Sequence, residues 1–195
     1  MFSVHAPSEG DLQSLLARAR KQRFSYPEVE ASRTTMPNMY LRRQSRIRLG
    51  SGAIAFSRAI EALHSWQMVR IAGVRIYPTN PPIEPGNDVV LMIRCFGIWS
   101  LNLCRVVYVS DIDEPSTRRF SFAYGTLPEH VIRGEERFTV ERDIRTDAVY
   151  YEILSFSRPA TAMARAGYPI VRMLQDRFTR KSLSGMRRAT ETDLR

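Results

Sequence analysis

The chain of 195 residues carries 29 Lys and Arg against 20 Asp and Glu, so its formal net charge is +9, and 44% of its residues are hydrophobic. This composition is typical of a folded domain, excludes a disordered chain, and at this length allows a core to form without disulfides or metals. No apolar run is long enough to span a membrane and the first residues lack the basic and apolar segments of a secretory signal, so we expect a cytoplasmic protein.

The positive charge comes almost wholly from arginine, since Lys21 and Lys181 are the only lysines. Arginine suits phosphate-rich partners, but scattered arginines also give an ordinary solvated surface. Only residues 177–195 are locally dense in basic side chains. We therefore interpret the charge mainly as a basic exterior and disfavour nucleic acid as a partner.

The first third of the chain predicts two helices and one strand. Ser8 and Asp11 are spaced to cap a helix whose apolar stripe includes Leu12 and Leu15. Residues 23–39 contain two prolines and predict an irregular connection. Residues 42–50 alternate as a half-buried strand does, and residues 53–66 carry a helical apolar stripe.

Strand signals dominate the middle of the chain. Residues 69–78 predict a strand with a bulge near Gly73, and residues 88–97 and 101–109 predict strands that are apolar on both faces. A turn centred on Trp99 and Ser100 would place Cys95 opposite Cys104. A disulfide there is conceivable, but we interpret both cysteines as reduced core residues.

The last third predicts three more strands and one long helix. The strands cover residues 118–127, 136–144 and 148–157, and the helix starts at Arg158 and contains Pro169, which should kink it. The predicted fold class is therefore α+β, a curved antiparallel sheet packed on a long C-terminal helix, as in helix-grip or START-like proteins. We expect an N-terminal helix and connection over 1–38, a single core domain over 39–180 and a basic flexible tail over 181–195.

Five segments carry a family resemblance: RFSYPEVEAS (23–32), LGSGAIAFSRAIEALHSW (49–66), CFGIWSLNLCRVVYV (95–109), FAYGTLPEHVIRGEERF (122–138) and FSRPATAMARAGYPIVRMLQ (156–175). Together they resemble the family known as domain of unknown function nineteen-ninety, over nearly the whole chain. The resemblance implies a helix-grip outline and supplies no mechanism.

The segment 122–138 predicts a hairpin whose loop holds His130. Glu135 and Glu136 are adjacent on an extended strand, so they should point to opposite faces and not act as a close pair. His130 could act as a general base oriented by one of these glutamates, or could simply bind the loop backbone. Tyr124 ends a row of aromatic side chains that suits either a core or a pocket wall.

We predict binding of a small, largely apolar ligand in a cavity between the sheet and the C-terminal helix. The expected site residues are Met92, Phe96, Arg105, Phe122, Tyr124, Thr126, His130, Glu135, Met163 and Ile170. One alternative is an enzyme that uses His130, Glu135 and Tyr124 in the same cavity, although no catalytic residue is assigned. The other is a protein that binds an anionic surface or nucleic acid. The histidines and cysteines lack metal-site spacing, no cofactor motif is present, and the oligomeric state stays open.

Overall fold

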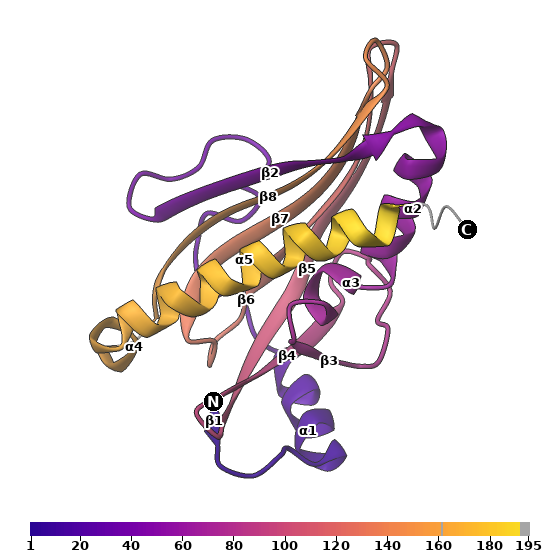
Figure 1. Ribbon diagram of the computed structural model, residues 1–195. Coiled ribbons are helices and arrows are strands. Elements are labelled where there is room, and N and C mark those ends of the chain that lie inside the picture. The colour runs from indigo at the N-terminus through magenta and orange to yellow at the C-terminus, as the bar shows by residue number, and fades with distance from the viewer. Residues whose placement is uncertain (161, 192–195) are drawn as a thin grey trace.

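The computed structural model describes residues 1–160 and 162–191, with the side chains of residues 162 and 163 outside the description. Its centre is a curved antiparallel sheet with the strand order β2-β8-β7-β6-β5-β4-β3, and β1 pairs with β5 (Figure 1). The strands are β1 (Phe2–Ser3), β2 (Leu41–Ser51), β3 (Arg75–Tyr77), β4 (Asp88–Cys95), β5 (Ile98–Glu114), β6 (Thr117–Thr126), β7 (Ile132–Asp143) and β8 (Ala148–Pro159).

Helices pack on both faces of this sheet, but more of them pack on one face than on the other. They are α1 (Glu9–Ala19), α2 (Gly52–His64), α3 (Gln67–Arg70), α4 (Ala162–Ala166) and α5 (Tyr168–Thr190). Helices α2, α3 and α5 pack on what we call the inner face, and α5 crosses it diagonally (Figure 1). Helix α1 packs on the opposite, outer face, against β4 and β5. The predicted α+β helix-grip class is confirmed.

Aromatic side chains fill the inner face. Trp66, Phe122 and Phe138 are fully buried, and the ring centroids of Trp66 and Phe122 lie 5.3 Å apart while those of Phe122 and Phe138 lie 5.4 Å apart. Met186 of α5 is also fully buried in this cluster. Burial of such large apolar side chains is the main stabilising contribution to the fold.

The outer face is covered by two separate patches. The predicted capping box forms at Ser8 and Asp11, and Leu12 and Leu15 of α1 then pack against the lower parts of β4 and β5. The irregular segment 24–40 packs further along, where Tyr26 and Tyr40 contact Phe156 of β8. The part of the outer face that these patches do not cover carries polar side chains.

The β4–β5 connection differs from the expected one. The turn lies at Phe96 and Gly97, not at Trp99 and Ser100, so Cys95 pairs with Ile98 and Cys104 pairs with Val89. Both turn residues have positive φ, which Gly97 adopts without steric cost. The expected opposition of Cys95 and Cys104 is therefore wrong, and both thiols are free.

Residues 69–78 do not form one bulged strand. Residues 67–70 are helical and only Arg75–Tyr77 are extended. The helical turn buries Met68 and Val69 completely, which an edge strand with one covered face would not do. Tertiary packing thus overrides the β-branched composition of this segment.

The C-terminal helix also begins later and ends later than expected. Strand β8 continues to Pro159, and the expected single helix is divided at Gly167 into α4 and α5, so that Pro169 stands in the first turn of α5, where a missing N–H is tolerated. At its other end α5 buries Ser182, Gly185 and Met186 against the core. Residues 181–190, expected in a flexible tail, are therefore packed helix.

Candidate functional site

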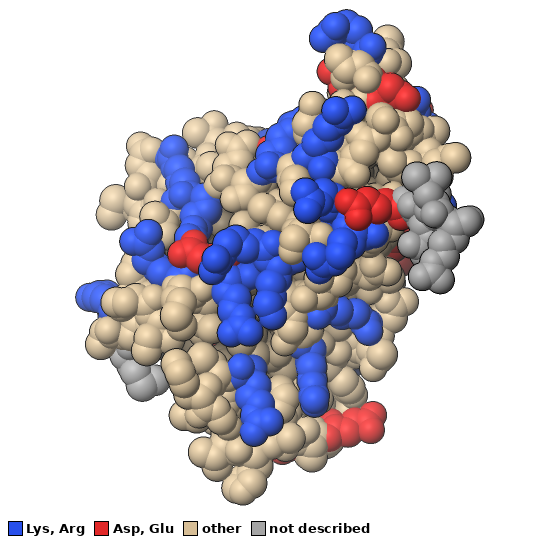
Figure 2. Space-filling model, in the orientation of Figure 1, with Lys and Arg blue, Asp and Glu red and all other residues tan. Residues whose placement is uncertain are grey.

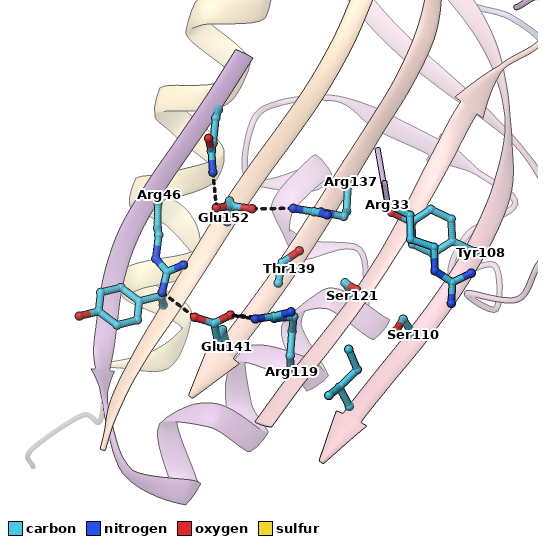
Figure 3. Close-up of a pocket in the computed structure, with 13 residues that line it drawn as sticks. Arg33, Arg46, Tyr108, Ser110, Arg119, Ser121, Arg137, Thr139, Glu141 and Glu152 are labelled. Atoms are coloured by element: carbon cyan, nitrogen blue, oxygen red, sulfur yellow. Dashed lines mark hydrogen bonds and ion pairs between the residues drawn. The ribbon is translucent and has the colours of Figure 1, made fainter. Parts of the chain in front are cut away.

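A polar pocket of about 390 Å³ opens on the outer face of the sheet (Figure 3). Strands β2, β5, β6, β7 and β8 supply its floor, and the segment before β2 supplies one arginine. The lining residues are Arg33, Gln44, Arg46, Tyr108, Ser110, Ile112, Arg119, Ser121, Arg137, Thr139, Glu141, Tyr150 and Glu152. Its volume falls within the usual range of small-molecule sites, but its lining is far more polar.

Strand alternation builds this pocket. On β7, Arg137, Thr139 and Glu141 line it, while the intervening Phe138 and Val140 lie in the inner core. The strand register places Thr139 beside Ser121 on one side and beside Glu152 on the other. Neighbouring strands therefore bring residues that are distant in sequence onto one small polar surface.

Glu152 is the more buried of the two pocket carboxylates. It accepts hydrogen bonds from Arg137 Nη2 at 2.9 Å and from Gln44 Nε2 at 2.8 Å. Arg137 also donates through Nη1 to the carbonyl oxygen of Ser32 at 2.7 Å. This arginine is thus held in place from two sides.

Glu141 is clamped between two arginines. Arg119 Nε donates to Glu141 Oε2 at 2.7 Å, and Arg46 Nη2 donates to Glu141 Oε1 at 2.8 Å. Partial burial alone would raise the pKa of Glu141, but the hydrogen bonds and charges of both arginines lower it overall. Glu141 is therefore ionised at neutral pH.

Two tyrosines and two arginines form the sides of the pocket. The Arg33 guanidinium lies over the Tyr108 ring at 5.0 Å from its centroid, and the Arg46 guanidinium lies over the Tyr150 ring at 4.2 Å. The Tyr108 hydroxyl is also hydrogen-bonded to Ser32 Oγ at 2.9 Å. Cation–π stacking leaves the guanidinium N–H groups available to a ligand.

Two buried polar atoms of the pocket lack a protein partner. Among the described residues, Arg137 Nε and Thr139 Oγ1 are buried without a hydrogen bond, as is Gln22 Oε1 elsewhere. An unsatisfied buried polar group costs about 1–3 kcal/mol. Both residues line the pocket, although these two atoms are themselves buried.

The charges of the lining sum to a positive value. Four arginines face two glutamates, which gives +2 before any ligand is present. The neighbouring hydroxyls of Ser110, Ser121 and Thr139 are uncharged. The arrangement therefore favours an anion that also exchanges hydrogen bonds with hydroxyl groups.

Glu135 and Glu136 point to opposite faces, as predicted. Glu135 lies on the outer face, is 2% exposed and accepts hydrogen bonds from Tyr26 Oη at 2.7 Å, from the Glu30 and Ser32 amides at 2.9 and 3.1 Å, and from Ser32 Oγ. These bonds fasten the segment 24–40 to the sheet. Glu135 therefore positions Arg33 and Ser32 beside the pocket and is not itself a pocket residue.

Glu136 lies on the inner face beside Tyr124, whose hydroxyl donates to it at 2.5 Å. Burial raises the pKa of Glu136 to about 7, although the Tyr124 hydrogen bond and the charge of Arg43 act in the opposite direction. Burial also raises the pKa of Tyr124 well above its usual range. The predicted aromatic row that ends in Tyr124 is thus part of the core, with one titratable carboxyl at its end.

The predicted hairpin over 122–138 is confirmed, with Phe122 opposite Phe138 and Tyr124 opposite Glu136. Its loop histidine, His130, accepts a hydrogen bond at Nδ1 from the Ile132 amide at 3.1 Å. Burial and the nearby N-terminal ammonium lower the pKa of His130 to about 3. His130 is a neutral loop residue, and the structure does not bring it together with Glu135 and Tyr124.

The glycines of this hairpin permit close approaches. A Cβ at Gly125 would lie 2.1 Å from Tyr26 Oη, and one at Gly134 would lie 1.9 Å from the Phe156 carbonyl oxygen. Gly134 also has φ of +149°, which L side chains rarely adopt. The motif residues are therefore required for attachment of the segment 24–40 and for pairing of β7 with β8.

The remaining predicted site residues are dispersed. Met92 packs under α1 on the outer face, and Arg105 there donates to Asp88 at 2.7 Å and to the carbonyl oxygen of the last α1 residue at 2.8 Å. Phe122 lies in the inner core, and Thr126 Oγ1 accepts a hydrogen bond from the Gly134 amide. Phe96 and Ile170 are 82% and 48% exposed. The side chain of Met163 lies outside the described residues.

Sequence reasoning missed the polar pocket. The sequence pattern that could have revealed the pocket is the alternation of Arg137, Thr139 and Glu141 with apolar residues, together with Arg119 and Ser121 on the neighbouring strand. Those side chains were interpreted as a solvated exterior. Only the curvature of the sheet and the register reveal that they face one another.

Basic side chains form a second electrostatic feature. Figure 2 shows them gathered in a band across the side of the molecule where α5 and β2 lie in Figure 1. Exposed arginines of α5 contribute, while Asp176 and Glu191 neutralise part of the charge through pairs with Arg43 and Arg187. The basic side chains lie closer together on the surface than their scattered positions in the sequence indicated.

No group of three or more His, Cys, Asp or Glu side chains among the described residues could hold a metal ion. None of the described helices has the length and apolar character needed to cross a membrane.

Known proteins match this chain in sequence and in fold. A UPF0548 protein of Dictyostelium discoideum is 33% identical over 206 aligned positions, covering 97% of this chain and 95% of that protein. A UPF0548 protein of Deinococcus radiodurans is 37% identical over 193 positions, covering 92% and 94%. The crystal structure of TTHA0849 from Thermus thermophilus aligns with a TM-score of 0.50 at 10% identity over 77% of this chain and 97% of that one, a likeness of fold alone. The family model described as domain of unknown function (DUF1990) matches residues 25–185, and the chain belongs to this family.

Proposed function

We propose that the protein binds a small phosphate ester that also carries hydroxyl groups, in the polar pocket of the outer face. The observation that carries this proposal is the lining of the pocket, in which four arginines face two glutamates beside the hydroxyl groups of serine and threonine. The helix-grip fold serves here as the support for a small-molecule site.

The charge of the pocket selects the ligand class. A phosphomonoester carries close to two negative charges at neutral pH, which balances the +2 of the lining. Arginine forks bind phosphate oxygens through paired N–H groups. Glu141 and Glu152 hold three of the arginines in place and leave lone pairs for ligand hydroxyls.

Binding accounts for this geometry better than catalysis does. The lining contains neither histidine nor cysteine, and Glu141 is kept ionised by Arg46 and Arg119. A general acid or base requires a pKa near the working pH. The enzyme candidates expected from the sequence, His130, Glu135 and Tyr124, lie outside the pocket.

Binding of a largely apolar ligand along the C-terminal helix is the second candidate. It is favoured by a groove of about 470 Å³ on the first half of α5, lined by Tyr168, Pro169, Arg172, Met173, Asp176 and Arg180. Val171, Leu174 and Phe178 of this half are only half-buried, whereas the second half packs tightly. The groove residues fall on the side of α5 opposite these three side chains, so an apolar ligand bound in the groove would lie on the exposed side of the helix.

Titration calorimetry on the purified protein tests the two candidates. Glycerol 3-phosphate and ribose 5-phosphate should bind, whereas glycerol and ribose should not. Arg119→Gln should weaken phosphate-ester binding at least about tenfold, on the order of 1.4 kcal/mol, through loss of a charged donor. Arg145→Gln removes the same charge from an exposed turn outside the pocket and is the matched control.

Equal affinities of the Arg119→Gln and Arg145→Gln variants would contradict the pocket assignment. Uptake of the neutral apolar probe N-phenylnaphthylamine without any phosphate-ester binding would replace the first candidate by the second. In that case Met173→Asp should abolish probe uptake, because Met173 lines the groove on α5.

A further inference from the structure

Apolar side chains are exposed at one corner of the sheet, where β1 lies beside the start of β5 (Figure 1). Phe96 is 82% exposed, Val4 71%, Phe2 53% and Ile98 44%. The pairing of Ser3 with Trp99 places the two short segments side by side. We call these four residues the apolar tip.

The backbone at this tip has a conformation that is unfavourable for the residue that occupies it. Phe96 has φ of +48° and Gly97 has φ of +80° in the two-residue turn between β4 and β5. Asn or Gly is preferred at the first position of such a turn, and a bulky aromatic residue there is costly. Because the Phe96 side chain is largely exposed, burial within this chain does not offset the cost. Strain of this kind is typical of functional positions.

The surroundings of the tip are positively charged. The Arg75 and Arg94 guanidinium groups both lie over the Trp99 ring, at 5.0 and 5.7 Å from its centroid. Residues 89–110, which include the tip hairpin, contain no Asp or Glu. The tip thus combines exposed apolar side chains with two neighbouring arginines.

These features together fit an anionic membrane surface. A projecting two-residue turn offers far less area than the roughly 800 Å² per partner of a stable protein interface. Peripheral membrane binding needs only a few apolar side chains that enter the headgroup region, assisted by basic residues near anionic lipids. We propose that the apolar tip inserts Phe96 and its neighbours into the interface of an anionic bilayer.

Vesicle sedimentation with the full chain tests this inference. Vesicles of phosphatidylcholine and phosphatidylserine should bind the protein, and vesicles of phosphatidylcholine alone should bind it less. Phe96→Asn should reduce the partition coefficient at least about fivefold and should not reduce thermal stability, because Asn suits the turn. Met39→Asn removes another exposed apolar side chain, 79% exposed and far along the chain, and should leave binding unchanged.

Two further variants separate insertion from general charge attraction. Phe96→Trp should give a blue shift of fluorescence on vesicle addition above the constant contribution of buried Trp66 and Trp99. Arg94→Gln should weaken binding and flatten its salt dependence.

Equal partition of the wild type and the Phe96→Asn variant would overturn the proposal. So would a concentration-dependent dimer that Phe96→Asn dissolves while no vesicle binds, since the tip would then contact a second copy of the chain. Because none of these variants lies in the polar pocket, failure of the inference leaves the phosphate-ester proposal separately testable.

Discussion

The two faces of the central sheet carry different kinds of side chain and serve different purposes. On the inner face, Phe120, Phe122 and Tyr124 of β6 and Phe138 and Val140 of β7 join a packed core with α2, α3 and α5. On the outer face, the alternate residues are arginines, glutamates and hydroxyl side chains around an open pocket. The difference shows that a single register can specify stability on one side and recognition on the other.

The inner face gains its stability from burial, which is insensitive to salt and pH apart from Glu136. The outer face gains little net stability from its ion pairs, because partly exposed charges are screened by water. Its arginines are instead oriented by Glu141 and Glu152. We therefore expect substitutions on the two faces to separate stability from binding.

The largest effect should come from adjacent residues of β7. Phe138→Ala should lower the free energy of unfolding by about 3–5 kcal/mol, since a fully buried ring is lost from the inner core. Thr139→Val should change it by less than about 1 kcal/mol, because the hydroxyl removed has no protein partner. Urea unfolding of both variants measures the contrast. Similar losses for the two would show that the faces are energetically alike.

The next largest loss of stability should follow substitution of Glu135, which anchors the segment 24–40 to the sheet. Glu135→Ala should cost about 2–3 kcal/mol, because it leaves the buried Tyr26 hydroxyl and the Ser32 groups without their acceptor. Amide exchange should accelerate in residues 26–34, and phosphate-ester binding should weaken as Arg33 loses its position. Glu135→Gln, which keeps one acceptor oxygen, should give smaller changes. Unchanged exchange in Glu135→Ala would show that other contacts hold the segment.

Local sequence patterns predicted most of the fold. The alternation in residues 118–157 and the spacing in residues 8–19 and 52–64 are consistent along each element, so strands and helices follow directly. The failures have tertiary causes. Residues 67–70 are helical because a helical turn buries Met68 and Val69. Pro169 lies in the first turn of α5, which starts ten residues after the Arg158 start that the pattern predicts.

The site was less predictable than the fold. Aromatic residues near Tyr124 indicated a cavity, but the ring of Trp66, from an element far away in sequence, and the ring of Phe138, from the other strand of the same hairpin, pack against Tyr124. The pocket on the other face depends on which strands are neighbours. Arg46, Arg119 and Glu141 meet only because β8 lies between β2 and β7, a pairing that no local pattern encodes.

The pH dependence of stability should reveal the one carboxyl at the edge of the inner core. Glu136 has a pKa of about 7 in the folded protein and an ordinary value of 4.5 when unfolded. The folded state therefore binds this proton more tightly, so its contribution is fully present below pH 4.5 and is lost as pH rises to about 7. Between pH 5 and 8 the wild type should lose about 2–3 kcal/mol relative to Glu136→Gln.

His130 acts in the opposite direction but cancels in this comparison. Its folded pKa of about 3 lies below the ordinary 6.5, so its contribution is lost as pH falls from 6.5 towards 3 in both proteins. Thermal unfolding across the pH range gives the difference between the two curves. Parallel curves would mean that Glu136 titrates normally.

The smallest stability effect should come from the rim of the pocket. Arg46→Gln should cost less than about 1 kcal/mol, because its side chain is 41% exposed and Arg119 still holds Glu141. Phosphate-ester affinity should nevertheless fall, since one of four arginines is removed from the lining. Arg118→Gln breaks the comparable exposed pair with Asp113 on the hairpin and should leave affinity unchanged. If the two variants lost affinity equally, net charge and not the geometry of the outer face would govern binding.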